Sequence, residues 1–283
     1  MKYAIILCVL FLFLASAVTL HAQESCDASL ETDSYVRYMP SADREQAPGE
    51  VGLIESGSKY TYKFKVADKM PVELAIGGEY IGIDENVNVP LPAHLTCVAL
   101  DLDTYLPTPY DDIYLGIGVS PSFYGEDWDY ESSAFRIPVR SYLVYQPSEE
   151  LTWLAGVAVY PDFDNEVWPI LGVIYKPDEQ WYFNLTPKRP SISYKLSERF
   201  TLFVEGGLTN SEFEVERNNV EGVVLKYKEM HLGSGVKFDL NDYVQTSLSL
   251  GGAFNRQLKY RDERGKVNIE NGLYAEFRLQ TKF

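Results

Sequence analysis

The chain has 283 residues and a formal net charge of −16 at pH 7, and 14% of its residues are aromatic. This excess of negative charge argues against nucleic acid and anionic lipid as partners, because basic surfaces bind both. The mean hydropathy of −0.18 is that of a soluble protein. Membrane β-barrels combine such a value with many aromatic residues, since alternate residues face lipid and a polar interior.

The first 22 residues predict a secretory signal peptide. Lys2 precedes an unbroken apolar run from Ala4 to Ala15, and small and polar residues follow through Ala22. The run is much shorter than the roughly 20 residues of a spanning helix, and no later segment is long and apolar enough to span a membrane as a helix. We expect cleavage after Ala22, with Ala17 as the alternative site, and therefore export of the chain.

A polar leader, residues 23–33, follows the signal peptide and contains Cys26. The mature chain has one other cysteine, Cys97. Export exposes this even pair to oxidation, but sequence separation does not show whether the two Cα atoms come close enough to bridge. A disulfide and two free thiols are therefore both open.

Residues 34–283 predict one domain of alternating strands. Between Lys59 and Val66, aromatic and aliphatic residues alternate with Thr and Lys, a period of two that is typical of a strand with one apolar and one polar face. Further strands are predicted near 35–39 and at 71–80, 94–104, 112–120, 134–145, 151–160, 167–176, 181–186, 191–196, 200–208, 222–238, 243–254 and 272–283.

The connections between these strands alternate in length. Tight turns occur at 147–150, 177–180, 196–199 and 240–242, and longer polar loops at 82–93, 121–133, 209–221 and 255–271. Outer-membrane barrels have short periplasmic turns and long external loops. We therefore predict an all-β fold, a transmembrane antiparallel up-and-down β-barrel of about 14 strands, or about 12 if the short pair around 188–190 lies outside the wall.

The strand at 222–238 is longer than a bilayer requires, and its apolar pattern changes phase. Val223, Leu225 and Tyr227 are expected to face outward, followed by Met230 and Leu232. We expect a β-bulge near residues 228 and 229, where the strand would project above the membrane.

The last strand carries the strongest signal for the cellular location of the protein. Its outward face is predicted to hold Leu273, Ala275, Phe277, Leu279, Thr281 and Phe283. A chain that ends on an aromatic residue in such a strand is typical of outer-membrane barrels of Gram-negative bacteria. Phe277, Leu279 and Phe283 are the predicted assembly signal, and the expected partners are the barrel assembly machinery, outer-membrane lipid and lipopolysaccharide.

Several turn and strand motifs resemble one known family. They are Val167-Trp168-Pro169-Ile170-Leu171-Gly172-Val173-Ile174-Tyr175, Pro177-Asp178-Glu179-Gln180-Trp181, Lys188-Arg189-Pro190 and Ser193-Tyr194-Lys195-Leu196-Ser197-Glu198-Arg199, and the segments 74–80 and 112–119 are similar to its early strands. The family is domain of unknown function 6268, uncharacterised bacterial outer-membrane proteins. This resemblance implies a barrel fold and implies no catalytic residue.

Charged residues on the inward faces of the strands are the candidate lumen-lining groups. The principal ones are Asp101, Asp103, Arg136, Arg140, Glu205 and Arg278. In a narrow barrel they would pair across the lumen and fill it, because buried charges need partners, and in a wider barrel they would line a water-filled pore. Arg136 and Arg140 are expected to share one face around Pro138, either attracting an anion or pairing with Asp101 and Asp103.

These features favour a passive, porin-like pore or transporter for small solutes of unknown identity. The alternative is a non-conducting structural or surface-binding barrel with a packed lumen. An enzyme is the least favoured class, because the mature chain has only His94 and His231, and no nucleophile elbow or metal-ligand spacing accompanies them. No cofactor is expected. Acidic loops could bridge to lipopolysaccharide through a divalent cation, but a solvated acidic surface explains them as well.

Overall fold

The computed structural model describes residues 28–45, 47–66, 70–87, 89–128, 132–217, 220–261 and 265–283. The predicted signal peptide and Cys26 lie outside the described residues, so cleavage and the disulfide stay predictions. Within the described ranges there is no helix with the length and apolar character needed to cross a membrane.

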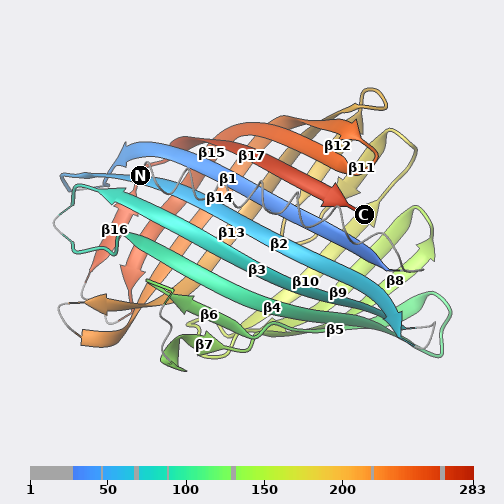
Figure 1. The fold of residues 1–283 in the computed structure, drawn as a ribbon, viewed down its shortest axis with the longest axis horizontal. Helices are drawn as coiled ribbons and strands as arrows, with labels where there is room; N and C mark the ends of the chain where they lie inside the picture. The colour runs from blue at the N-terminus through green and yellow to red at the C-terminus, as the bar shows by residue number, and fades with distance from the viewer. Residues whose placement is uncertain are drawn as a thin grey trace.

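Fourteen antiparallel strands form the wall of a closed β-barrel (Figure 1), which confirms the predicted fold class and the higher strand count. Its wall strands, in order, are β1 (Ser29–Asp43), β2 (Glu50–Val66), β3 (Met70–Glu85), β4 (His94–Pro107), β5 (Ile113–Val119), β8 (Val139–Ser148), β9 (Leu151–Val159), β10 (Val167–Tyr175), β11 (Trp181–Asn184), β12 (Ser191–Lys195), β13 (Phe200–Arg217), β14 (Val220–Asn241), β15 (Val244–Tyr260) and β17 (Gly272–Lys282). The barrel closes where β1 pairs with β17, in the register Tyr35↔Arg278.

Three short strands continue wall strands beyond a break. β6 (Ser122–Gly125) continues β5, β7 (Phe135–Arg136) continues β8, and β16 (Lys266–Ile269) continues β17. Pro121 and Pro138 lie at the first two breaks, and proline interrupts a ladder because it has no N–H to donate.

Several boundaries predicted from the sequence are wrong. β1 begins at Ser29, so the end of the expected leader, residues 29–33, belongs to the first strand. The loop expected at 209–221 is a continuation of β13 and β14, which pair up to Arg217↔Val220. The loop expected at 255–271 likewise contains the end of β15 and all of β16. The polar composition of these segments suggested loops. A strand that extends beyond the bilayer has water on its outer face, so this face needs no apolar residues.

Strand length differs greatly around the barrel. β13, β14 and β15 have 18, 22 and 17 residues, whereas β9, β11 and β12 have 9, 4 and 5. The long strands extend beyond the short ones at the loop end. There a single parallel bridge, Glu214↔Gly125, joins β13 to β6. This bridge closes the wall above the side on which the strands are short.

The interior of this loop-end half is an apolar core. It contains Met39, Val51, Leu53, Ile81, Ile83, Leu95, Cys97, Phe213, Val215, Val223, Leu225, Tyr227, Ala253, Leu258, Tyr260, Val267, Ile269 and Tyr274. The outward orientation predicted for Val223, Leu225 and Tyr227 is therefore wrong. Outside the bilayer, water lies on the outer face of the barrel, so apolar side chains pack inward there, on the face that is polar lower in the same strand.

The bulge predicted in β14 lies instead in the neighbouring strand, β15. The register between β14 and β15 shifts between Lys228 and Met230, so that Glu229 faces two residues of β15, Asn255 and Arg256. Asn255 has a positive φ of 49°, as expected for the extra residue of a bulge. The shift turns the Arg256 side chain into the interior, where it is fully buried.

The outer face carries the apolar band that a bilayer requires. Large side chains such as Ile76 and Leu273 are 55% and 75% exposed on it. At the turn end Tyr243 stacks on Phe283, with ring centroids 5.7 Å apart. The terminal residue is thereby fixed next to the β1–β17 seam, where Leu30 and Phe283 also exchange two backbone hydrogen bonds of 2.8 and 2.9 Å.

We predict that Phe283→Asp impairs assembly of the barrel, because it removes an aromatic contact at the closing seam. The measurement is the fraction of heat-modifiable protein in the outer membrane. Phe200→Asp is the matched control, since Phe200 is paired with Phe238 at the same end of the barrel with centroids 4.9 Å apart. Equal losses in both variants would mean that assembly depends on any aromatic pair at the turn end of the barrel, and not on the C-terminal residue in particular.

Candidate functional site

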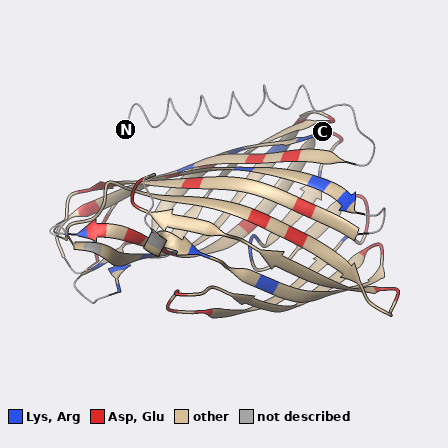
Figure 2. Cartoon of the chain, turned by 60° about the horizontal axis from the view of Figure 1, so that its bottom comes forward, with Lys and Arg blue, Asp and Glu red and all other residues tan. Residues whose placement is uncertain are grey.

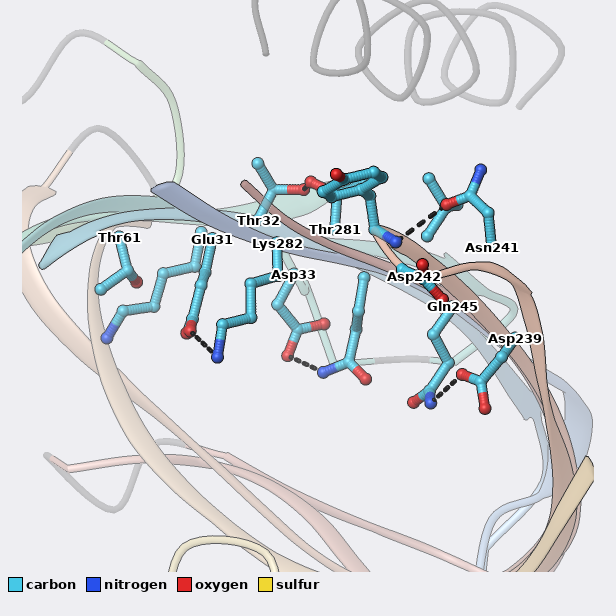
Figure 3. Close-up of a pocket in the computed structure, with 14 residues that line it drawn as sticks. Glu31, Thr32, Asp33, Thr61, Asp239, Asn241, Asp242, Gln245, Thr281 and Lys282 are labelled. Carbon is cyan, nitrogen blue, oxygen red and sulfur yellow. Dashed lines mark hydrogen bonds and ion pairs between the residues drawn. The ribbon is translucent and has the colours of Figure 1, made fainter. Parts of the chain in front are cut away.

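A polar cavity lies at the turn end of the barrel. It has a volume of about 460 Å³ and is lined by polar side chains from β1, β2, β14, β15 and β17. Figure 3 shows Glu31, Asp33 and Lys282 pointing to one side of the sheet and Thr32 and Thr281 to the other. The charged groups are paired along the wall, with Lys282 Nζ 3.6 Å from Glu31. We call this cavity the vestibule.

One pair of predicted lumen residues lies together on the wall between β4 and β8. Arg140 binds Asp103 with two nitrogens, and Nε is 2.7 Å from Oδ1. Asp101 accepts from Lys59 Nζ and from Ser120 Oγ, each at 2.5 Å. The Arg140 and Asp103 side chains keep 27% and 14% exposure. They form cross-strand pairs, as the simpler of the two interpretations of the sequence required, in a part of the lumen that water reaches.

Arg136 does not join this group. Pro138 separates it from β8, and Arg136 instead donates to the backbone carbonyl oxygens of Ser133 and Phe135. The prediction that Arg136 and Arg140 form one shared site is therefore wrong, because the strand that was to carry both is broken between them.

A second, deeper group of charges lies on the inner faces of β1, β2, β14 and β17, and Figure 2 shows charged residues along the strands of the barrel. Arg37 is at its centre, with nitrogens 2.7 Å from Glu276, 3.2 Å from Glu55 and 3.5 Å from Glu229. The exposed fractions of the Arg37 and Glu276 side chains are 6% and 1%. Tyr227 donates to Glu229 at 2.7 Å. We call these five residues the charge belt.

Two further predicted lumen residues lie directly below the charge belt. Glu205 is bound by Arg189 at 2.6 and 2.7 Å, and Arg189 also reaches Glu276 at 3.1 Å. Arg278 binds both oxygens of Asp33, at 2.8 and 2.9 Å. Arg189 comes from the loop between β11 and β12, residues 185–190, which therefore contributes side chains to the lumen.

Sequence reasoning missed Arg37, Glu55 and Glu229. Arg37 alternates with Tyr35 and Met39, and Glu229 is two residues from both Tyr227 and His231. Charged residues at alternate positions of otherwise apolar strands were the available signal. That signal does not reveal partners, because Arg37 and Glu276 are 239 residues apart.

The wall has a lateral gap above the loop at 185–190. β10 pairs with β11 only through Ile174 and Tyr175, and β13 pairs with β12 only from Thr201 to Glu205. In the described part of the chain, no strand pairs with the facing edges of β10 from 167 to 172 and of β13 from 207 to 213. We call this gap, framed by β10, β13 and the loop below, the window.

The loop between β9 and β10, residues 160–166, closes the window at the top. Asp164 is 3.1 Å from Lys226 Nζ and 2.9 Å from Arg261 Nε, and its backbone N–H donates to Glu212 at 3.0 Å. Phe163 is buried against Tyr124, with ring centroids 5.5 Å apart. This loop is thus attached to the far side of the gap by ion pairs and one aromatic contact.

The window contains an apolar hollow of about 540 Å³. Outward-facing Leu171, Leu208 and Leu232 line it, with Pro187 on the loop below and His231 at its inner end. A Cβ atom on Gly207 would lie 2.4 Å from Cε1 of His231. Because glycine has no Cβ, the His231 ring lies over the backbone of β13 and reaches the gap.

His231 also joins the hollow to the charge belt. The guanidinium of Arg37 lies against its ring, with Nη1 and Nη2 each 3.2 Å from a ring nitrogen. The other mature-chain histidine, His94, is at the loop end of the barrel and is 2.7 Å from Asp127. The two histidines are therefore in unrelated places.

The chain is similar to one protein family and to several solved structures. Residues 132–280 match the family model described as Domain of unknown function (DUF6268). No curated protein matches the sequence. An outer membrane channel from Pseudomonas putida F1 is 10% identical with a TM-score of 0.48, over 92% of this chain and 97% of that one. A FadL homologue from Pseudomonas aeruginosa has the same identity and TM-score, over 90% and 89%. LpxR from Salmonella typhimurium is 10% identical with a TM-score of 0.41, over 89% and 99%.

We predict that Arg37→Ala costs about 3–5 kcal/mol of stability, because it leaves buried carboxylates without a partner. Arg140→Ala, the matched control in the hydrated part of the lumen, should cost about 1 kcal/mol or less, as for exposed ion pairs. The measurement is the temperature at which the folded band is lost on semi-native gels. Equal losses would show that the lumen around Arg140 is as dry as the charge belt.

We also predict that the loop at 160–166 detaches in acid. Burial alone would raise the pKa of Asp164, but the hydrogen bond from Lys226 and the charges of Lys226 and Arg261 outweigh it and lower the pKa. The attachment is therefore fully present above the ordinary carboxyl pKa of about 3.9 and is lost as pH falls below it. Pepsin cleavage near Phe163 should rise in that range, relative to a denatured reference peptide. In the Asp164→Asn variant, pepsin cleavage should already be high at pH 4.5. A wild-type protein whose cleavage does not change with pH contradicts the prediction.

Proposed function

The chain belongs to the family Domain of unknown function (DUF6268), and on that premise we propose that it is an outer-membrane channel for small solutes in which the solute passes through the window and not along the barrel axis. The proposed activity depends on the geometry of the lumen and of the window. The single observation that carries it is the position of the apolar hollow, which lies in the window and has His231, a neighbour of Arg37 in the charge belt, among its lining residues.

The barrel axis is a poor route. The charge belt lies on the inner faces of β1, β2, β14 and β17, and the apolar core occupies the loop-end half of the interior, with Leu95, Leu225 and Val267 all fully buried. An ion on this path would lose its water among side chains that offer no replacement. We therefore propose the window, and not the axis, as the route for a solute that enters the vestibule.

The alternative function is a non-conducting barrel that works by binding or by structure. The charge belt supports it, because buried and paired charges favour one rigid arrangement of the lumen. Outer-membrane lipid and lipopolysaccharide remain the proposed surroundings in either case, and the absence of an enzymatic activity stays a prediction.

Uptake of the uncharged fluorophore 1-N-phenylnaphthylamine by intact cells tests the proposal. Expression of the protein should increase the initial rate severalfold, while the purified barrel in planar bilayers shows no large, stable ion-conducting steps. Gly207→Leu should abolish the increase, because its side chain enters the space next to His231. Gly78→Leu is the matched control, since a Cβ there meets only a carbonyl oxygen at 3.6 Å.

Two outcomes contradict this function. Large steady conductance in the wild type would mean that the axis is open. Unchanged uptake on expression of correctly folded protein would favour the non-conducting barrel.

A further inference from the structure

We infer that the window is a binding site for small uncharged molecules that have an apolar body and one hydrogen-bonding group. This inference rests on the proposed function and names its solute class. It depends on the lining of the hollow, on the polar atoms that reach it and on the charges behind it.

The lining excludes charged ligands. No Lys, Arg, Asp or Glu is among the described residues around the hollow, whose walls are Leu, Met, Phe and Pro side chains. Transfer of an ion into such a lining would cost far more than the contacts return. A volume of about 540 Å³ is within the range of small-molecule sites, about 300–1,000 Å³.

Among the described residues that line the hollow, only Thr186 and His231 have polar side chains. Thr186, on the loop below the window, donates its hydroxyl to Asn184 Oδ1 at 2.8 Å, which leaves its oxygen able to accept. His231 is at the inner end of the hollow, over Gly207. A ligand with several polar groups would leave some of them unsatisfied, whereas one group is enough for either contact.

The charges behind His231 disfavour an anionic headgroup in particular. Arg37 is the cation nearest its ring, and Glu55, Glu229 and Glu276 already occupy that guanidinium. An added carboxylate would therefore meet three others and compete with them for one cation.

A lipid acyl chain is the competing occupant, because Leu171 and Leu208 face the membrane and are 68% and 60% exposed. An acyl chain would need to occupy only the outer part of the hollow. The lining also includes Gly207 and His231, and His231 contacts Arg37 of the charge belt; this contact with the interior is the reason for assigning the hollow to a solute that leaves the lumen.

Photolabelling with benzophenone tests the site directly, since benzophenone is an uncharged molecule with two apolar rings and a single polar group, and its competitor diphenylmethanol has a hydroxyl that can donate to Thr186. The full mature chain in lipid nanodiscs is irradiated with increasing probe, and labelled positions are mapped by mass spectrometry. We expect saturable labelling around Leu171, Leu208 and Leu232, competed by diphenylmethanol. Labelling at Leu273, on the lipid-facing surface of β17, should rise linearly and resist competition. The anionic analogue 4-benzoylbenzoate should not label the window.

Gly207→Leu should abolish the saturable part and Gly78→Leu should retain it, with folding of both checked by heat modifiability. Window labelling that is no more saturable than at Leu273, equal labelling by 4-benzoylbenzoate, or suppression by added phospholipid in place of diphenylmethanol would each overturn the site. The last result would identify an acyl chain as the occupant. Saturable labelling without cellular uptake would support the binding site and contradict the proposed channel function. Uptake without saturable labelling would contradict the binding site and support the channel function.

Discussion

In a bilayer every backbone N–H and C=O group needs a partner within the protein, and this requirement governs the whole structure. A closed ladder of strands satisfies it, and the seam between β1 and β17 completes that ladder from Tyr38↔Ala275 to Glu31↔Lys282. Unpaired backbone at membrane depth is tolerated only where protein covers it or a water-filled cavity adjoins it. The edges of β10 and β13 at the window are the described exception, and the loops at 160–166 and 185–190 lie above and below this gap.

Unequal strand length connects the window to the closed axis. Because β11 and β12 have only 4 and 5 residues, the wall between β10 and β13 ends early. The long strands beyond it have no neighbour on that side, and β13 curves across to meet β6 at Glu214↔Gly125. That contraction brings inward faces close enough to pack as an apolar core. One feature of the chain, a shortened hairpin, therefore closes the barrel at the loop end and leaves a lateral opening below.

The charges in the lumen follow the amount of water at each level. Near the vestibule, Arg140 and Asp103 keep part of their hydration and form an ordinary cross-strand pair. In the middle, Arg37 has three carboxylates around it and almost no exposure. A buried guanidinium so placed holds β1, β2, β14 and β17 in one relative position, because movement of any strand would leave a charge without a partner. Arg256, fully buried at the bulge with Nε 3.9 Å from Glu229, adds a second cation to the same region.

The sequence by itself determined the class of this protein. Alternation of Leu273, Phe277 and their neighbours with Glu276 and Arg278, together with tight turns such as 177–180, specifies lipid-facing strands, because a period of two is a local property of an extended chain. Tertiary structure decided where the inward charges find partners, why Arg136 is separated from Arg140, and why Tyr227 faces a core and not lipid. Those outcomes depend on how far each strand extends past its neighbours and on which strands meet across the barrel. Local alternation carries no information about either, since residues such as Arg37 and Glu276 become neighbours only when the first strand closes on the last.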